Sequence, residues 1–497
     1  MTDMTFEKWK AEAAGLSIRD QAFIDGKFVD ATSGKRFSSI NPATGSVLAE
    51  VAEGDAADIN AAVTAARRAF DDGRWSRLPP GDRKAVLLKL ADLIRENLKE
   101  MALLDSLDMG KLVQDAVTID APGSAHFFQW YAEAIDKVYD EVAPTGPGDL
   151  ALIARVPLGV VGAVVPWNFP LDMATWKAAA ALAAGNSVVL KPAEQSPLSA
   201  LRLAELAAEA GVPDGVFNVV PGYGPTAGKA LGIHMDVDCL AFTGSTAIGK
   251  KFMEYAGQSN MKPVWPETGG KSPNLIFADC EDLEAAADMA AFGIFFNQGE
   301  VCSANSRLYV ERSIKDKVLE KMVARANTAQ PGDPLDPASK MGAIVDETQT
   351  QGIMGFVEAG KSSAKLVTGG DRVTINGKGC FVEPTIFETS HDNPLARDEI
   401  FGPVLSVIPF DSEDEAIAMA NDSVYGLAAS VWTDNLSRAI RVADKLHAGT
   451  VSVNTVDALS AQTPFGGMKQ SGFGRDLSLH SFDKYTALKT TWIKYKT

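Results

Sequence analysis

The chain has 497 residues, 46% of them hydrophobic and 22% charged, which allows two or three domains with large cores. Its formal net charge of −17 argues against a nucleic-acid partner, because phosphate binding requires a surplus of Lys and Arg. No run approaches the roughly 18 apolar residues of a membrane helix and the N-terminus has no secretory pattern, so we expect a cytoplasmic protein without a membrane partner.

The predicted elements change character along the chain. A strand-like segment at 22–29 is followed by helices over 56–70, 80–100 and 123–138. From residue 159 strands and helices alternate, with strands expected at 159–165, 187–190, 216–220 and 239–242 and helices at 171–184, 199–210, 226–231 and 246–255. This alternation predicts a parallel sheet with right-handed crossovers, the doubly wound architecture typical of nucleotide-binding domains.

A second alternation begins near Gly269. Strands are expected at 274–277 and 306–310, and helices at 283–296 and 314–326. A second α/β domain therefore follows the first. The segment 485–495 alternates as a strand does, and a strand at the end of a chain often pairs with another subunit or domain.

The segment FTGSTAIG at 242–249, at a predicted strand-to-helix junction, is the candidate phosphate site. Gly244 permits a tight turn after which Ser245 can begin the helix, whose first N–H groups and positive dipole end suit a pyrophosphate. Gly249 would let helix and sheet approach closely. Neither GxGxxG nor GxxxxGK[ST] is complete, so an ordinary N-capped helix remains the alternative.

Lys191 and Glu194 follow the second predicted strand of this sheet at its carboxyl end. Ribose hydroxyls lie there in doubly wound folds, and a cation with a carboxylate three residues later suits two vicinal hydroxyls. The alternative is an ion pair in a solvated loop.

The segment PWNFP at 166–170 also follows a strand end. An amide held between prolines and aromatic rings is a rigid donor, so Asn168 is a candidate for stabilising an oxyanion. The competing interpretation is a structural Asn that caps the next helix.

A thiol and a carboxylate are the candidate catalytic pair. Glu267 stands in ETGG and Cys302, 35 residues later, ends QGEVC. A nucleophilic thiol and a carboxylate base together permit acylation and then hydrolysis. The four cysteines form no CxxC pair and the five histidines are scattered, so neither a disulfide framework nor a metal site is expected. Most of these cysteines are expected to be packing residues.

Seven segments occur together in one order. They are PWNFP (166–170), KPAE (191–194), FTGSTAIG (242–249), ETGGKSPN (267–274), FNQGEVC (296–302), EIFGPV (399–404) and PFGGMKQSG (464–472). In this order the chain resembles the NAD(P)-dependent aldehyde dehydrogenase superfamily over essentially its whole length. Its fold is therefore expected to be α/β: a Rossmann-like cofactor domain, a second α/β catalytic domain and a small β bridging arm.

The resemblance implies a role for each matched residue. Cys302 matches the nucleophile, Glu267 the general base, Asn168 the oxyanion donor and Lys177 a lysine linked to proton relay. Expected cofactor contacts are Pro166, Trp167, Lys191, Glu194, Gly244, Ser245, Gly249, Glu399 and Phe401. Thr268 departs from the commoner Leu or Ala after the base, and its hydroxyl is expected to bond either Glu267 or the backbone.

The family architecture also implies domain limits. Residues 1–137 and 157–266 would form the NAD-binding domain, 267–480 the catalytic domain, and 138–156 with 481–497 the bridging arm. Because this arm builds dimers and tetramers in the family, a homodimer or homotetramer is expected. NAD is the expected cofactor, since Glu194 would bond a ribose 2′-hydroxyl and repel a 2′-phosphate, although some relatives with this glutamate also use NADP.

The implied reaction forms a thioester on Cys302, which water activated by Glu267 hydrolyses. Because that carboxylate is present, we predict release of a free acid and not transfer to coenzyme A. A non-catalytic binding or structural protein on the same fold is the alternative, which the intact Cys302, Glu267 and Asn168 disfavour. A cysteine hydrolase lacks a histidine partner in the motif set.

The substrate is predicted from both resemblance and pocket. WYAEAIDKVYDEVAPT (130–145), SNMKPVW (259–265) and the ending LKTTWIK resemble bacterial ω-aminoaldehyde dehydrogenases of polyamine and arginine breakdown, whose substrates include γ-glutamyl-γ-aminobutyraldehyde and 4-guanidinobutyraldehyde. Expected pocket residues are Phe169, Asp172, Trp176, Val301, Ser303, Asp457 and Phe465. Two carboxylates there would favour a cationic tail. Asp172 equally suits a helix N-terminus, and a broad-specificity or semialdehyde enzyme stays open.

Overall fold

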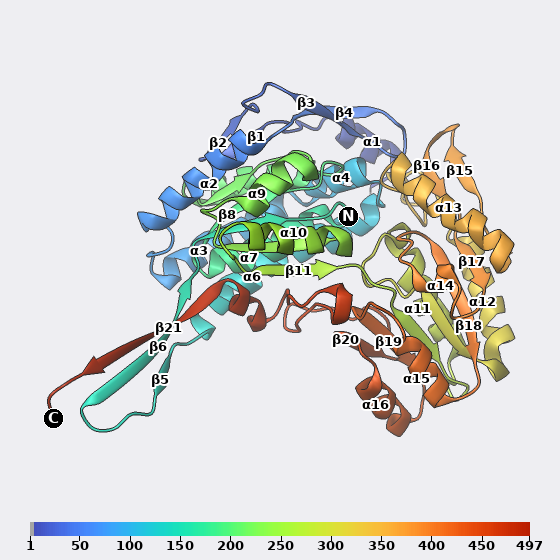
Figure 1. Ribbon diagram of the computed structural model, residues 1–497. Helices are drawn as coiled ribbons and strands as arrows, with labels where there is room; N and C mark the ends of the chain where they lie inside the picture. Colours follow the sequence, from blue (N-terminus) through green and yellow to red (C-terminus); the bar gives the residue numbers. More distant parts are fainter. Residues whose placement is uncertain (1–3) are drawn as a thin grey trace.

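The computed structural model describes residues 4–497 as two α/β lobes with a projecting arm (Figure 1). The first three residues of the predicted NAD-binding domain lie outside the described residues. The chain forms most of the first lobe, passes through β11 into the second, and returns at its C-terminal end to the first lobe and the arm.

Within residues 4–497 the first lobe is built on a seven-stranded sheet. Its strands, in spatial order, are β11 (Val264–Thr268), β10 (Cys239–Gly244), β7 (Val160–Val164), β8 (Ser187–Lys191), β9 (Phe217–Val219), β1 (Ala22–Ile24) and β2 (Lys27–Val29). The strands from β11 to β9 pair in parallel, which confirms the doubly wound prediction. The strand order reverses between β7 and β10, and ligands bind at such a switch point, beyond the carboxyl ends of the strands.

Residues that alternate along the strands pack on two helical layers, as the period of a β-strand requires. Val161 and Ala163 face one layer and Val160 and Val164 the other. The first layer comprises α3 (Pro80–Glu96), α6 (Ala121–Ala134), α7 (Pro170–Ala183) and α8 (Leu198–Ala210). The second comprises α2 (Ala56–Asp71), α9 (Lys229–Ile233) and α10 (Thr246–Gln258).

Three predicted elements differ from the structure. The single strand expected at 22–29 is a hairpin of β1 and β2, because Asp25 and Gly26 both adopt positive φ (55° and 79°) and turn the chain. The helix expected at 80–100 is divided at Asn97 into α3 and α4 (Leu98–Met109). The helix expected at 226–231 begins as a π-turn over Gly224–Gly228 before α9.

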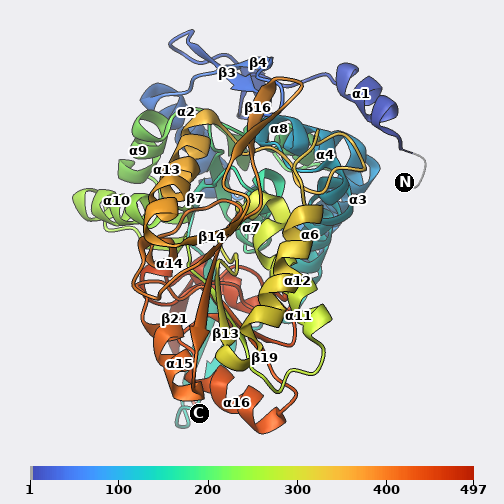
Figure 2. The same cartoon turned by 90° about the vertical axis from the view of Figure 1, so that its right-hand side faces the viewer.

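In the described chain the second lobe also has a seven-stranded sheet. Its order is β14 (Lys365–Thr368), β17 (Thr385–Glu388), β18 (Val404–Phe410), β13 (Arg307–Glu311), β12 (Pro273–Ile276), β19 (Ala428–Trp432) and β20 (Thr450–Val453). All neighbouring strands pair in parallel except β14 with β17. The accompanying helices are α11 (Leu283–Phe295), α12 (Lys315–Thr328), α13 (Glu347–Ser363), α14 (Pro394–Arg397), α15 (Glu413–Asn421) and α16 (Leu436–Lys445). Helices α12 and α13 lie on the outer side of this lobe (Figures 1 and 2).

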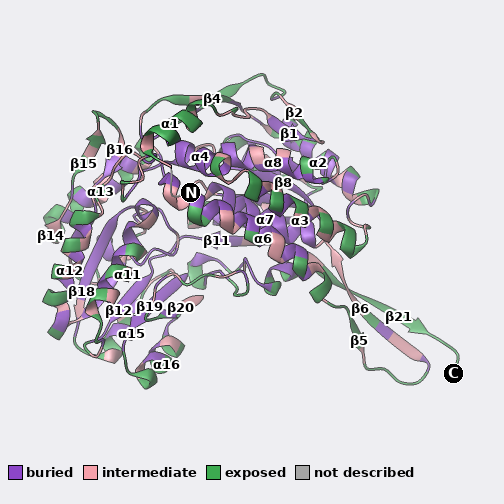
Figure 3. Ribbon diagram, turned by 180° about the vertical axis from the view of Figure 1, so that it is seen from behind, coloured by how far each residue is buried: buried purple, intermediate pink, exposed green. Residues whose placement is uncertain are grey.

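The arm is an antiparallel sheet that extends away from both lobes. Its strands are β21 (Thr486–Lys494), β6 (Asp149–Pro157) and β5 (Glu141–Ala143), with Thr486 paired to Pro157 and Lys494 to Asp149. Most of β21 is exposed (Figure 3). The predicted arm segments contain β5, β21 and all of β6 except Pro157, whereas the predicted limit at 266/267 falls within β11. The exact domain limits therefore stay a prediction.

The remaining elements connect or cover the lobes. They are α1 (Phe6–Ala14), β3 (Arg36–Ile40), β4 (Val47–Ala52), α5 (Val113–Asp115), the π-turn Ala116–Asp120, β15 (Arg372–Ile375) and β16 (Lys378–Val382), with short 3-10 turns at Ile135–Lys137, Phe296–Gly299, Arg312–Ile314, Lys469–Ser471 and Leu479–Lys484. Among the residues from 4 onward, no helix combines the length and hydropathy needed to cross a bilayer.

Candidate active site

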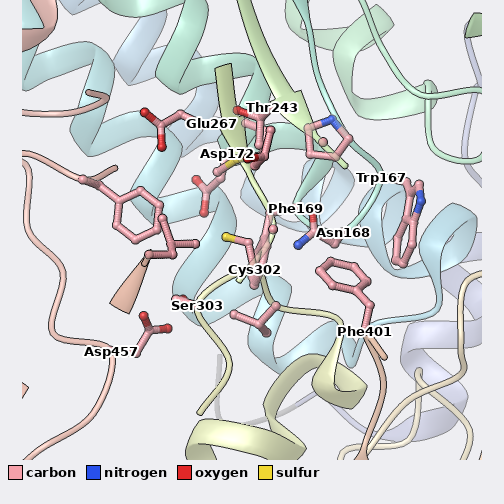
Figure 4. Close-up of a pocket in the computed structure, with 18 of the residues that line it drawn as sticks. Trp167, Asn168, Phe169, Asp172, Thr243, Glu267, Cys302, Ser303, Phe401 and Asp457 are labelled. Carbon is pink, nitrogen blue, oxygen red and sulfur yellow. The ribbon is translucent and has the colours of Figure 1, made fainter. Parts of the chain in front are cut away.

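A cavity of about 570 Å³ lies where the carboxyl ends of β7, β10 and β11 face the second lobe. Asn168, Gly244 and Glu267 reach it from the first lobe, and Cys302 and Phe401 from the second. This is the switch point of the first sheet, where a doubly wound fold binds its ligand. In Figure 4 the Cys302 sulfur lies near the middle of the view, with Asn168 beside it, Trp167 and Phe401 on one side and Asp457 on the other.

Most of the residues predicted for the site line this cavity. They are Pro166, Trp167, Asn168, Phe169, Asp172, Trp176, Gly244, Ser245, Glu267, Val301, Cys302, Ser303, Glu399, Phe401, Asp457 and Phe465. Four predicted residues lie outside its lining: Lys177, Lys191, Glu194 and Gly249.

A strained turn presents Cys302 to the cavity. After α11 the chain turns through Asn297 and Gln298, whose φ values of 47° and 58° lie in the left-handed region. Such non-glycine conformations cost of order 1 kcal/mol or more each and persist only where surrounding contacts hold them. Asn297 Nδ2 donates to the Asn168 carbonyl at 3.0 Å, and Gln298 Oε1 accepts from Gly342 N at 3.2 Å. The turn is thus locked to both lobes.

The side chain of Asn168 is fixed beside this turn. Its Nδ2 donates to the Glu300 carbonyl at 2.9 Å, and its own carbonyl accepts from Asn297. A primary amide carries two N–H donors, so one remains for a group in the cavity. Phe169, and not Asn168, is the N-cap of α7, and no side chain caps that helix. The capping interpretation of Asn168 is therefore wrong.

The thiol of Cys302 is held in its protonated form. Burial raises its pKa to about 12, and the negative charges of Asp457, Glu399 and Glu267 act in the same direction. Since the thiolate is the nucleophile, attack on a carbonyl from this site requires a base that accepts the thiol proton.

The carboxylate of Glu267 is buried and has no hydrogen-bond partner on either oxygen. Burial, and then the charge of Asp476, raise its pKa well above the usual range. The backbone of two glycines encloses it, because a Cβ on Gly466 or Gly474 would lie 2.7 or 2.9 Å from Glu267 Oε1. The group is therefore poised to exchange a proton with whatever occupies the cavity.

Lys177 is buried and forms an ion pair with Asp476, which also pairs with Lys484. Burial alone would raise the pKa of Asp476, but the charges of the two lysines lower it overall. Asp476 and Lys484 were not predicted from the sequence. Nothing in their local pattern distinguishes them, since Asp476 lies 299 residues from Lys177 along the chain.

Thr268 resolves one of the predicted alternatives. Its hydroxyl donates to the Gln470 carbonyl at 2.7 Å and not to Glu267. The hydroxyl thus ties the end of β11 to the Lys469–Ser471 turn and leaves the Glu267 carboxylate unpartnered.

One end of the cavity is flat and aromatic. The rings of Trp167 and Phe401 meet edge to face with centroids 5.3 Å apart. Phe401 has a φ of 55°, and Gln349 Nε2 donates to its carbonyl at 2.7 Å. Glu399 accepts from Gly270 N at 2.9 Å, and burial raises its pKa to about 7. This end of the cavity thus presents two aromatic rings and the carboxylate of Glu399.

The cavity also reaches the N-terminus of α10, where Gly244 and Ser245 line it. Ser245 is the N-cap, and its hydroxyl accepts from Ile248 N at 3.4 Å. A Cβ on Gly249 would lie 3.0 Å from Thr268 Cγ2, so glycine allows α10 to pack closely on β11. Lys191, at the end of β8, is buried and donates to Glu194 Oε2 at 3.2 Å, whereas Glu194 in the following loop is partly exposed. The solvated-loop interpretation therefore does not fit Lys191.

The other end of the cavity combines aromatic rings with acids. Trp176 and Phe465 lie 5.3 Å apart between centroids, and Phe169 faces Phe296 at 6.2 Å. Asp172 accepts from Ser124 Oγ at 2.6 Å. Burial, and then the charge of Asp120, raise the pKa of Asp172 well above its usual range.

Asp120 is a lining residue that was missed from the sequence. One carboxylate oxygen of Asp120 pairs with Lys111, and within residues 4–497 the other has no partner. The Lys111 ammonium also lies 4.0 Å from the centre of the Phe169 ring. Asp120 lies in the π-turn before α6, and no motif marks it. On the opposite wall, burial raises the pKa of Asp457.

Comparison with known proteins agrees with this geometry. A model described as "Aldehyde dehydrogenase family" matches residues 28–491. The chain belongs to the aldehyde dehydrogenase family. The NADP/NAD-dependent aldehyde dehydrogenase PuuC of Escherichia coli (strain K12) is 51% identical over 486 residues, covering 98% of each chain. The enzyme is accordingly an NAD(P)-dependent oxidoreductase that oxidises aldehydes, and the family resemblance predicted from its motifs is confirmed.

Two solved structures are similar over the full length. The gamma-glutamyl-gamma-aminobutyraldehyde dehydrogenase from Burkholderia cenocepacia J2315 has a TM-score of 0.98 and 57% identity. The P. syringae indole-3-acetaldehyde dehydrogenase AldA, solved with NAD+ and IAA, has a TM-score of 0.98 and 55% identity. Each comparison covers 99% of this chain and 100% of the other. The predicted aldehyde dehydrogenase fold is therefore confirmed.

The turn before Cys302 predicts a sharp sensitivity at Gly299. Its φ is 71°, and an added Cβ would lie 2.3 Å from the Gly402 carbonyl oxygen. We expect Gly299→Ala to destabilise the enzyme by about 2 kcal/mol or more, measured as a lower midpoint of thermal unfolding. Gly352→Ala, on an exposed position of α13 with nothing within 4 Å, should be neutral or slightly stabilising. Equal midpoints for both variants would contradict this.

The raised pKa of Cys302 predicts how its alkylation depends on pH. Below the pKa, each pH unit increases the thiolate tenfold, so labelling of the ligand-free enzyme by iodoacetamide should accelerate steadily from about pH 7 to about pH 10. Peptide mass mapping isolates Cys302 from the other thiols. A plateau below about pH 9 would show an ordinary thiol and would refute the burial argument.

Proposed function

We propose that the enzyme oxidises an aldehyde carrying a cationic tail to the free carboxylic acid, through a thioester on Cys302 and with NAD as the preferred cofactor. The observation that carries this proposal is the composition of one cavity. Cys302, Asn168 and Glu267 share it, and Asp120 and Asp172 line its far end.

The residues at the aromatic end suit a dinucleotide. The N-terminus of α10, with Gly244 and Ser245 at the cavity, offers free N–H groups to a pyrophosphate. Thr243 Oγ1 is buried there without a partner. Lys191 and Glu194 would hold the adenosine ribose, and Glu194 disfavours a 2′-phosphate. Trp167, Glu399 and Phe401 would hold the nicotinamide end.

Acylation begins with the protein's own groups. Cys302 Sγ attacks the aldehyde carbon, and its proton passes to Glu267. The negative charge that develops on the aldehyde oxygen is bonded by the free N–H of Asn168 and by the backbone N–H of Cys302, a contribution of about 3 kcal/mol in comparable sites. Because Glu267 has no other partner, its oxygens are available for this proton.

Hydrolysis completes the reaction. When bound, NAD would accept the hydride that leaves the thiohemiacetal carbon, so that a thioester remains on Cys302. Once Glu267 has released the thiol proton to solvent, it takes a proton from water, whose oxygen attacks the thioester carbon. The C–S bond breaks, Cys302 recovers its proton, and a carboxylic acid leaves. The burial that raises the pKa of Glu267 makes it a stronger base than an exposed carboxylate, which favours water over coenzyme A as the acceptor.

The far end of the cavity supports a cationic substrate. Asp172 and Asp120 are both buried there, and within residues 4–497 Lys111 is the only cation that pairs with either of them. An ammonium in this position would bond the open oxygen of Asp120 and favour the ionised form of Asp172. The similarity to gamma-glutamyl-gamma-aminobutyraldehyde dehydrogenase supports an aminoaldehyde derived from polyamine breakdown.

An aromatic aldehyde is the second candidate. The rings of Phe169, Trp176 and Phe465 form the cavity wall on the substrate side, together with Phe292 and Phe296. The likeness to an indole-3-acetaldehyde dehydrogenase favours this class of substrate. The acids at the far end are the feature that an aromatic substrate would leave unused.

We further propose a homodimer or homotetramer in the cytoplasm. The exposed apolar residues Leu488 and Trp492 on β21 would be covered by a second copy of the chain. All four cysteines are unpaired, as expected in a reducing compartment.

The nucleophile is tested directly. We expect Cys302→Ser to lower NADH formation from any aldehyde by at least about 10³-fold, because a hydroxyl is far less nucleophilic than a thiolate. Cys380→Ser, outside the cavity, should keep the parent rate. NADH absorbance measures both, and adding coenzyme A should change neither rate nor product. A Cys302→Ser enzyme as fast as the parent would end the proposal.

The substrate class is tested with 4-aminobutanal, butanal and indole-3-acetaldehyde. Asp172→Asn keeps an acceptor for Ser124 but removes the charge, so kcat/KM should fall at least about tenfold for 4-aminobutanal and stay constant for butanal. Because the pKa of Asp172 is raised, the parent's KM for the amine should fall as pH rises while the substrate stays protonated. Equal losses on both aldehydes, or a parent preference for the indole, would reject the cationic tail.

A further inference from the structure

We propose that Lys484 is a positioning residue for Glu267, which holds the base in its working state through Asp476 and ties it to the root of the arm. The proposal rests on the proposed function, in which Glu267 accepts protons during acylation and hydrolysis. Lys484 contacts neither substrate nor cofactor in this scheme, because it does not line the cavity.

Two lysines hold the carboxylate of Asp476 from both sides. Asp476 places one oxygen on Lys177 and the other on Lys484, and all three side chains are at most 3% exposed. The backbone of Asp476 is fixed by reciprocal hydrogen bonds of 2.8 Å with Phe465. A carboxylate held from both sides in this way has a single orientation beside the cavity that it lines.

The ionised form of Glu267 offsets part of the positive charge of this cluster. The ammonium groups of Lys177 and Lys484 and the carboxylate of Asp476 leave a surplus of one positive charge among side chains that are almost fully buried. Isolated buried charges are costly, so a second carboxylate is required nearby. Glu267 has both oxygens without a partner, and the charges of Lys177 and Lys484 act to lower its pKa against its burial. The surplus cation therefore stabilises the ionised base.

Other titratable groups face the cluster from each neighbouring element. They are Tyr131 on α6, Lys177 on α7, Cys239 on β10, Glu267 on β11, and Arg475 and Tyr485 on its own segment. Burial raises the pKa values of Tyr131, Cys239 and Tyr485 above their usual ranges, so these groups stay neutral. Only the lysines, Arg475, Asp476 and Glu267 contribute charge near neutral pH.

Lys484 also lies at the root of the arm. It ends the Leu479–Lys484 turn two residues before β21, and its carbonyl accepts from Cys239 Sγ at 3.3 Å. The next carbonyl, of Tyr485, accepts from Asn186 Nδ2 at 3.0 Å. The ammonium that holds Asp476 is thus anchored to the first lobe by the same few residues from which the arm extends.

The test separates acylation from hydrolysis with p-nitrophenyl acetate, an activated ester that can acylate Cys302 without hydride transfer. The burst of p-nitrophenol reports acylation, and the steady rate reports water attack. We expect Lys484→Met to keep the burst amplitude but to move the acidic limb of the steady rate about one pH unit higher, because removing a nearby cation raises the pKa of Glu267. Lys489→Met, on the exposed β21, should match the parent.

Two further variants make the result decisive. Lys484→Gln keeps a donor to Asp476 without the charge and carries the test if Lys484→Met does not fold. In a Glu267→Gln background, Lys484→Met should have no further effect on the pH profile, whereas a merely structural role would persist. An unmoved acidic limb in both Lys484 variants overturns the inference alone. A parent enzyme without any burst at Cys302 overturns the proposed function as well.

Discussion

The site depends on removal of water from a thiol and a carboxylate in one cavity. Burial raises the pKa of Cys302 to about 12 and that of Glu267 well above its usual range. Each group therefore binds a proton more tightly than an exposed counterpart would, and neither oxygen of Glu267 has another hydrogen-bond partner among residues 4–497. In the proposed reaction this is useful, because a basic carboxylate can take a proton first from the thiol and then from water. The cavity creates that basicity only if the two lobes remain closely packed around it.

Backbone conformations that few residue types adopt help to hold the two lobes in a fixed relative position. Asn297, Gln298 and Phe401 all adopt positive φ beside the cavity. Each is held by a hydrogen bond, which joins Asn297 to Asn168 of the first lobe, Gln298 to the loop at Gly342, and Phe401 to Gln349 of α13. The amide of Asn168 is fixed by the same turn that carries Cys302, so nucleophile and oxyanion donor move as one unit. Rigid placement of this kind is what electrostatic catalysis requires.

Charge is distributed unequally between the two ends of the cavity. Two lysines pair with Asp476 beside the base, whereas at the far end Asp120 pairs with Lys111 and Asp172 accepts only from Ser124 among residues 4–497. In the proposed reaction, the first arrangement would support the ionised base and the second would accept a cationic group of the substrate. If every acid at both ends of the cavity were paired with a lysine, no unpaired charge would remain to attract a charged substrate.

Much of this could be predicted from the sequence. The alternation of strands and helices after residue 159 determined both parallel sheets, since periodicity and turn residues act locally. The motifs around Asn168, Glu267 and Cys302 determined the family and placed three distant segments in one cavity. The segment 22–29 is predicted as one strand but forms a hairpin. The pair Asp25-Gly26 is itself a local sequence signal for such a turn.

Other features depended on tertiary structure. Asp476, Lys484 and Asp120 carry no motif, and their roles arise only because folding buries them against partners far away in the chain. The Thr268 hydroxyl had two possible acceptors in the sequence, and packing of the Lys469–Ser471 turn selected the Gln470 carbonyl. The physical reason is common to all of them. A sequence specifies which groups can ionise or bond, but burial and neighbouring charge decide which of them do.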